Sequence, residues 1–196
     1  MKLAVTSLEH IHKKGRFGNY QKQSGKKLLE ISEVKNLAII HLVQYKKSKI
    51  QPNTIKLENL ELPLDNPKVT ANKETRILWS APRTWLIISS KKNIISNIKN
   101  KCDRENFAIT DISHSKSIIE LEGNDAKEVL KKGCPFNFNE FHKNNCLNST
   151  YNGMSIIVDM INDKPDKFII FSLRSFGESL YHSLTDASLE FGYVGK

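Results

Sequence analysis

The chain has 196 residues, 39% of them hydrophobic, so it can bury a core as one domain or as two small ones, and it offers no run of about 18 apolar residues to span a membrane. Its net charge of +9 suggests a nucleic-acid partner, but 25 of the 30 basic residues are lysines spread along the chain, whereas phosphate and base recognition relies more on arginine, so we expect no such partner. The three cysteines lack CxxC spacing and residues 1–20 lack an apolar signal segment, which favours reduced thiols in a cytoplasmic protein.

The N-terminal third predicts few regular elements. Residues 1–28 are polar and lysine-rich with three glycines, which predicts an extended arm that is ordered only against a partner. The apolar run at residues 37–43 predicts a buried strand. Residues 46–75 carry three prolines and little periodicity, so we expect loops and at most a short helix there.

A hairpin and a helix follow. Residues 76–80 and 84–90 predict two strands around a turn at Ala81-Pro82-Arg83, where proline presets the backbone. Residues 91–103 have isoleucines at helical spacing, which predicts a helix of about three turns.

The second half repeats this style, with strands expected at residues 107–112 and 117–122. Asp125 is placed to cap a helix with Glu128 as its capping-box partner, and the buried stripe is Ala126, Val129 and Leu130. Gly133 stands where a left-handed C-terminal residue is wanted, and Pro135 prevents continuation of the helix.

Two further strands are expected at residues 154–160 and 167–173, and a final helix at residues 177–191 that Gly192 ends. Leu180, Tyr181, Leu184 and Ala187 would share the buried face of that helix. Strand pairs alternating with single helices predict an α+β fold of antiparallel sheets. We expect the arm at residues 1–28, a first α+β unit at 29–103 and a second at 104–196.

Catalytic motifs for nucleotide, metal or acyl-transfer chemistry are not found in the sequence. Trp79 and Trp85 flank the Pro82 turn; they can stack on a base or pterin, but core packing or an interface anchor is the favoured interpretation. His114 and Cys134 are a conceivable nucleophile pair, yet Cys134 follows a helix-ending glycine, where a small buried residue is useful.

Two polar junctions complete the set of candidates. At the end of a strand, Asp111 and Ser113 are expected to bond nearby backbone amides. Ser175 and Phe176 can cap and staple the last helix. Arg174 can bind a carboxylate of this chain or of a partner. Asp111 is the first partner that we expect, because the helix dipole disfavours a cation at a helix N-terminus and a carboxylate would offset that penalty.

These pieces, in their order and spacing, resemble the gamma subunit family of heterotetrameric sarcosine oxidase over roughly residues 35–194. The departures are Ala81, where the family tends to have glycine, and Asn124, where it tends to have proline. The segments that carry the resemblance are Leu62-Pro63, residues 78–86, Asp111 to His114, residues 123–130, Gly133-Cys134-Pro135, Phe141 with Cys146 and Thr150, Arg174-Ser175-Phe176 and Glu190-Phe191-Gly192.

The resemblance implies a fold similar to the folate-binding domains of glycine-cleavage T-proteins. It implies an accessory, non-catalytic subunit that associates with alpha, beta and delta subunits. Those subunits would hold FAD, FMN, NAD and tetrahydrofolate, and this chain no cofactor or metal. The complex would demethylate sarcosine to glycine, releasing formaldehyde or 5,10-methylenetetrahydrofolate. A stand-alone folate-type binding protein is the alternative.

Overall fold

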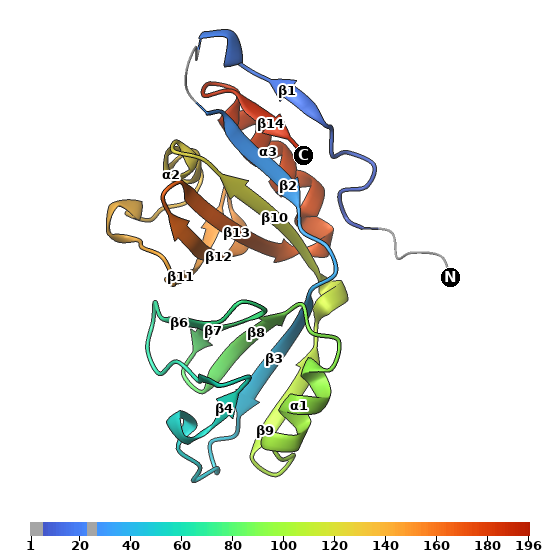
Figure 1. Cartoon of the computed structure of the whole chain (residues 1–196), viewed down its shortest axis with the longest axis vertical. Coiled ribbons are helices and arrows are strands. Elements are labelled where there is room, and N and C mark those ends of the chain that lie inside the picture. The colour runs from blue at the N-terminus through green and yellow to red at the C-terminus, as the bar shows by residue number, and fades with distance from the viewer. Residues whose placement is uncertain (1–5, 23–26) are drawn as a thin grey trace. The chain divides into compact units, whose positions relative to one another are not determined.

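The computed structural model describes residues 6–22 and 27–196, which form two compact α+β units, as the sequence predicted for the fold class. Unit 1 comprises residues 1–35, 115–143 and 148–196 apart from the undescribed positions, and unit 2 comprises residues 36–114 and 144–147. The chain therefore starts in unit 1, builds most of unit 2 and returns (Figure 1).

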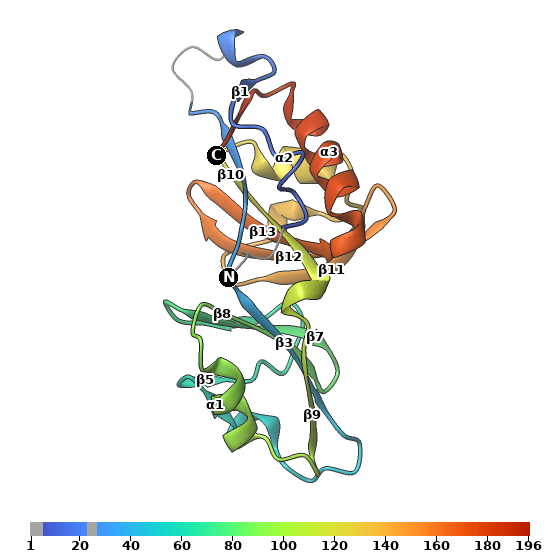
Figure 2. The same ribbon diagram turned by 90° about the vertical axis from the view of Figure 1, so that its right-hand side faces the viewer.

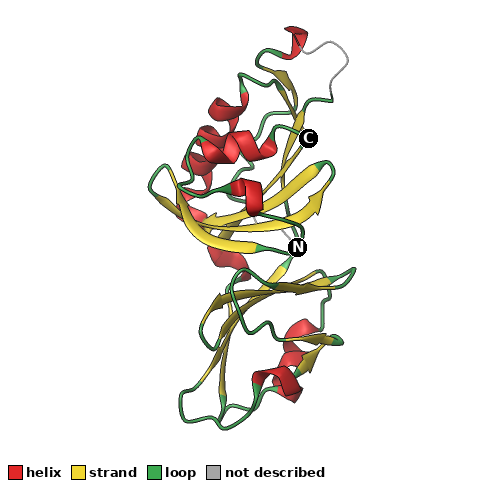
Figure 3. Cartoon of the chain, turned by 90° about the vertical axis from the view of Figure 1, so that its left-hand side faces the viewer, coloured by secondary structure: helices red, strands yellow, loops and turns green. Residues whose placement is uncertain are grey.

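Unit 1 contains a seven-stranded sheet in the order β1-β14-β2-β10-β13-β12-β11. β14 runs parallel to β2, while β10 is antiparallel to both β2 and β13. Helices α2 (Ala126–Lys131) and α3 (Gly177–Ser188) contact each other and β13, and they lie together on one side of the sheet (Figure 3). The strands are β1 (Gly15–Phe17), β2 (Leu29–Glu33), β10 (Lys116–Glu122), β11 (Cys146–Tyr151), β12 (Met154–Asp163), β13 (Asp166–Leu173) and β14 (Tyr193–Gly195).

Unit 2 contains a five-stranded antiparallel sheet in the order β6-β7-β8-β3-β9. Helix α1 (Ile94–Lys101) lies beside it, and a two-stranded hairpin of β4 (Lys56–Leu57) and β5 (Leu60–Glu61) precedes β6 (Figure 2). The sheet strands are β3 (Ala38–Gln44), β6 (Val69–Ala71), β7 (Thr75–Ala81), β8 (Thr84–Ser89) and β9 (Phe107–Asp111). The 3-10 turns of the two units are Tyr20–Lys22, Pro52–Thr54, Ser113–Ser115, Phe138–Glu140 and Arg174–Phe176.

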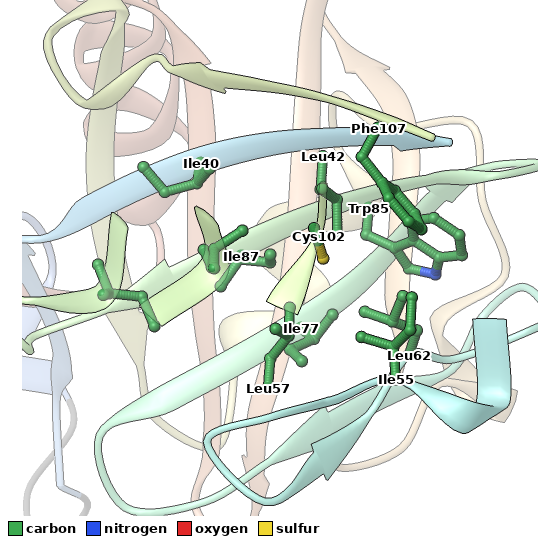
Figure 4. Close-up of a cluster of buried hydrophobic side chains, with 12 residues drawn as sticks. Ile40, Leu42, Ile55, Leu57, Leu62, Ile77, Trp85, Ile87, Cys102 and Phe107 are labelled. Carbon is green, nitrogen blue, oxygen red and sulfur yellow. The ribbon is translucent and has the colours of Figure 1, made fainter. Parts of the chain in front are cut away.

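A buried apolar core holds together the sheet of unit 2, α1 and the segment before β6. Apolar residues of four sheet strands, β3, β7, β8 and β9, meet Ile94 and Ile98 of α1 and residues of the segment before β6 (Figure 4). The segment at residues 46–75, expected as loops, thus closes the core through Ile55, Leu57 and Leu62, all under 10% exposed. The sheet residues in this cluster are Ile40, Leu42, Ile77, Trp85, Ile87 and Phe107.

The N-terminal arm differs from the expectation. Its described part packs on unit 1 without a partner: Leu8 is fully buried, its amide donates to Glu33 Oε1 (3.2 Å), and β1 pairs with β14. Polar composition did not reveal this because the contacts that fix the segment, among them the burial of Leu8 and the pairing of β1 with β14, are made with residues distant in sequence. Residues 1–5 and 23–26 of the expected arm lie outside the described residues.

The units also divide elsewhere than at the expected 103/104 boundary. Residues 29–35 supply β2 to unit 1, and residues 104–114 supply β9 to unit 2, because each strand pairs with strands distant in sequence. Short-range pattern does not specify such non-local pairs.

Three predictions about the ends of the helices are wrong. Asp125 is the N-cap of α2, but its side chain makes no capping hydrogen bond. Gly133 does not have a positive φ, whereas Gly123 (145°) and Gly192 (73°) do. α3 ends at Ser188, before the predicted Phe191. No helix in the described 6–22 and 27–196 ranges is both long and apolar enough to cross a membrane.

Candidate functional site

Trp85 belongs to the core of unit 2. Its side chain is 2% exposed, and its Nε1 donates a hydrogen bond to the carbonyl of Pro63 (2.7 Å). Trp79 lies opposite Trp85 in the β7–β8 register and is only partly buried. The carbonyl of Trp79 accepts a bond from Cys146 Sγ (3.3 Å). The arrangement therefore uses Trp85 for packing and joins it to the Leu62-Pro63 segment.

The turn between these two strands is exposed, and hydrogen bonds of Arg83 fix its position. Arg83 has a φ of 59°, uncommon for a residue other than glycine. Its guanidinium Nη1 donates to the carbonyls of Tyr45 (3.2 Å) and Lys46 (2.8 Å), and its own carbonyl accepts from the Gln44 amide (2.8 Å). The turn that carries Pro82 is thus bound to the segment that follows β3.

Asp111 and Ser113 are joined by local hydrogen bonds at the end of β9. Asp111 Oδ1 accepts from the amide (2.9 Å) and the hydroxyl (2.5 Å) of Ser113, and these bonds lower the pKa of Asp111 below its usual value. Ser113 Oγ in turn accepts from the Ile39 amide (2.9 Å), which ties the turn to β3. His114 follows with an exposed side chain. The expected bonds to nearby amides are present.

Cys134 is a buried thiol and lies in unit 1, whereas His114 lies in unit 2. Its Sγ is 3.3 Å from Ser149 Oγ, and burial raises its pKa. Because the thiolate is the nucleophilic form, these surroundings suit packing and not attack on a substrate.

Gly133 makes a close approach to an aromatic ring. A Cβ atom at this position would lie 2.7 Å from two ring carbons of Tyr151 and 2.8 Å from Asn152 Oδ1. The Tyr151 hydroxyl donates to the carbonyl of Val129 (2.9 Å), and burial raises the pKa of Tyr151 to about 12. Gly133 is therefore required by packing and not by a left-handed backbone.

Lys132 brings two separate motifs together. Its Nζ donates to the Ala187 carbonyl and to Glu190 Oε2, both at 2.7 Å, and lies 4.7 Å from the centre of the Phe191 ring. The Gly133 and Glu190-Phe191-Gly192 segments thus meet beside α3, next to an open cavity of about 770 Å³. Sequence reasoning missed Lys132, because nothing in the spacing distinguishes it from the other lysines.

The junction before α3 does not cap it as expected. Phe176 is the N-cap and makes no side-chain capping bond, Ser175 is exposed, and Phe176 is 41% exposed. Contact with the sheet comes instead from Gly177, where a Cβ would lie 2.7 Å from Ser117 Oγ. Arg174 lies in unit 1 and Asp111 in unit 2, so their pairing stays a prediction.

The described residues contain no cluster of three or more His, Cys, Asp or Glu side chains that could hold a metal. The three cysteines are buried, and none of them forms a disulfide.

Burial should make Cys102 slow to react. Desolvation raises its pKa to about 11, so at pH 8 its thiolate fraction is about a hundredfold lower than at an ordinary thiol pKa near 9. We expect iodoacetamide to label Cys102 at least that much more slowly in the native chain than in urea, with the native rate rising up to pH 11. Peptide mass spectrometry measures both rates; equal rates in the two states would contradict the burial.

Comparison with known proteins adds family evidence. The model of the sarcosine oxidase, gamma subunit family matches residues 53–190. The subunit gamma of sarcosine oxidase from Corynebacterium sp. strain U-96 is 26% identical over 120 residues, and that from strain P-1 is 27% identical over 120 residues. Each alignment covers 60% of this chain and 58% of the relative, so the chain spans less than two thirds of those relatives.

Solved structures share the fold. A chain of the heterotetrameric sarcosine oxidase from Corynebacterium sp. U-96, in complex with pyrrole 2-carboxylate, superposes with a TM-score of 0.81 at 20% identity and covers 97% of both chains. The glycine cleavage system aminomethyltransferase T from Bartonella henselae superposes with a TM-score of 0.69 at 12% identity, covering 99% of this chain and 60% of that one.

Proposed function

This chain belongs to the sarcosine oxidase gamma subunit family, and we propose on that basis that it is an accessory subunit of a heterotetrameric sarcosine oxidase. In this role it binds the large subunits and does no chemistry itself. The observation that carries the proposal is the fold match over 97% of both chains with a chain of such a complex, together with the family match over residues 53–190.

The placement of the motif residues supports a structural role. Trp85 and Cys134 are buried, Gly133 is packed against Tyr151, and Asp111 and Ser113 bond to each other and to β3. These residues therefore support the packing of the two units, whereas Pro82, His114, Ser175 and Phe176, which also carry the resemblance, are exposed. Such residues would be kept in a subunit whose task is to present a surface to its partners.

The finer assignments follow from the family. We propose that alpha, beta and delta subunits are the partners, and that FAD, FMN, NAD and tetrahydrofolate are bound by them. The complex would oxidise sarcosine to glycine in the cytoplasm, with the methyl carbon leaving as formaldehyde or 5,10-methylenetetrahydrofolate. A salt bridge between Arg174 and Asp111 remains our proposal for the junction before α3, and it would hold the fold or an interface.

The test is to express this chain, with an affinity tag, together with the chains encoded beside it. We expect three further subunits to co-purify in one complex that oxidises sarcosine, and flavin absorbance to follow those subunits when the complex is dissociated in high salt. A tagged chain that elutes alone at every salt concentration and binds a reduced folate in isothermal titration calorimetry would instead establish the stand-alone folate-type binding protein.

A further inference from the structure

Two segments at one end of the unit 2 sheet form a single exposed surface. One is the loop of residues 45–50 after β3, and the other is the Pro82-Arg83 turn between β7 and β8. Because β3 and β8 are antiparallel neighbours with Val43 opposite Thr84, both segments leave the sheet at the same end of these strands. The Arg83 bonds to Tyr45 and Lys46 hold the two together.

The loop of residues 45–50 is held from beneath by buried polar groups. Gln44 is 4% exposed, and its Nε2 donates to Ser48 Oγ (3.1 Å) and to the Ile50 carbonyl (2.7 Å). Ser48, 9% exposed, also donates its amide to the Tyr45 carbonyl (3.0 Å). The loop therefore has a defined shape before any partner arrives, which reduces the entropy cost of binding.

This shape leaves three cations outside. Lys46, Lys47 and Lys49 are exposed, and within the described part of the chain none of them forms an ion pair. The Tyr45 amide donates to the Asn106 carbonyl (2.9 Å), so the acidic residues of that segment are Asp103 and Glu105. The Asp103 carboxylate accepts from the amide and side chain of Asn106, and Glu105 is exposed and forms no ion pair with these lysines in the described part of the chain. Closely spaced cations without a counter-charge repel one another, and an acidic ligand removes that repulsion.

Beside the lysines lies an apolar hollow of about 620 Å³. It is lined by Val43, Gln44, Tyr45, Lys46, Pro82 and Arg83. Tyr45 is 38% exposed, and Pro82 is exposed as well. An apolar recess rimmed by positive charge suits an apolar side chain that is flanked by carboxylates.

We propose that Tyr45, Lys46, Lys47, Lys49, Pro82 and Arg83 form a docking surface for an acidic segment of another subunit, with one apolar side chain of that segment seated in the hollow. The inference rests on the proposed function and extends it, because it assigns the contact to particular residues of unit 2. It also accounts for the exposed Pro82-Arg83 turn, which packing of the core does not require.

Zero-length cross-linking of the intact complex tests the contact directly. A carbodiimide joins a lysine amine to a carboxylate only where the two touch. We expect peptide mass spectrometry to find Lys46, Lys47 or Lys49 joined to an Asp or Glu of another subunit, within a few residues of an apolar side chain. Cross-links from these lysines only to this chain's own carboxylates, or none, would overturn the proposal.

Charge reversal measures how much the three lysines contribute to retention of this chain in the complex. The variant Lys46→Glu/Lys47→Glu/Lys49→Glu should weaken retention of this chain in the complex by roughly tenfold or more at about 0.15 M salt, because like charges then face each other. The matched control, Lys73→Glu/Lys92→Glu/Lys99→Glu, makes the same charge change at exposed lysines elsewhere in unit 2 and should retain the parent affinity. Thermal melts of each free variant check that the fold is intact.

The outcomes separate the two proposals. Equal retention of the two triple variants would overturn the docking surface and leave the accessory role standing. Retention that disappears on nuclease treatment would identify nucleic acid as the occupant and also overturn it. Failure of the unchanged chain to co-purify with any subunit would overturn the proposed function and the docking surface with it.

Discussion

Replacing Trp85 by alanine should lower the free energy of unfolding by about 3–5 kcal/mol, the usual cost of deleting a buried aromatic side chain. Trp85 is 2% exposed and lies in the cluster that joins β3, β7 and β8 to the segment before β6 (Figure 4). The substitution also leaves the Pro63 carbonyl without its 2.7 Å donor. Since domains of this size are stable by about 5–15 kcal/mol, the loss is a large part of the total.

Urea unfolding of the isolated chain, followed by far-ultraviolet circular dichroism, measures this loss. Trp85→Phe is the matched control: it keeps a large apolar ring but lacks the Nε1 donor, so it should cost less than alanine. Trp79→Ala should also cost less, because Trp79 is only partly buried. An alanine variant as stable and as well assembled as the parent, in a complex that no longer binds folate, would show that Trp85 stacks on a ligand.

The fold class could be predicted because the strongest patterns are local. The β7–β8 hairpin carries its own turn at Pro82, and the buried stripe of α2 is visible at helical spacing in Ala126, Val129 and Leu130. Such patterns depend on neighbours within about ten residues. They specify that strands and helices exist and which face of each is buried.

The division into units could not be predicted because it depends on distant pairings. β2 joins the sheet of unit 1 between β14 and β10, so its neighbours come from far along the chain, and residues 144–147 return to unit 2 from the second half. In both cases the hydrophobic pattern permits a strand but does not name its partner. The same limit hid the packing of Leu8 on unit 1.

The candidate site residues show the same difference between local contacts, which could be predicted, and long-range contacts, which could not. The Asp111–Ser113 turn was predictable because both partners are two residues apart. The contacts of Lys132 with Glu190 and Phe191 span more than fifty residues and leave no trace in local spacing. Gly133 was singled out for a left-handed helix end, which its backbone does not adopt; what the position approaches instead is the ring of Tyr151, which only the tertiary fold brings near.

That close approach leads to the second prediction, that Gly133→Ala lowers the free energy of unfolding by about 1–3 kcal/mol, as overpacked positions do. Two effects oppose each other here. Because Gly133 does not have a positive φ, alanine fits the backbone and should stabilise by about 0.4–1 kcal/mol through the unfolded chain. Against this, the new Cβ would lie 2.7 Å from two ring carbons of Tyr151, and that ring is fully buried, so it cannot move aside. The steric cost is the larger of the two.

A double-mutant cycle with Tyr151→Leu separates the steric cost from a backbone cost, because leucine lacks the ring atoms that the Cβ would meet. In the leucine background we expect Gly133→Ala to be neutral or slightly stabilising, with both free energies taken from urea unfolding. If alanine costs the same in the two backgrounds, the demand for glycine lies in the backbone and the left-handed helix end that the sequence suggests is the better explanation. If the cost of Gly133→Ala disappears in the leucine background, the end of α2 is fixed by contact with β11. Glycine is then needed at this position because of a tertiary contact and not because of a local turn.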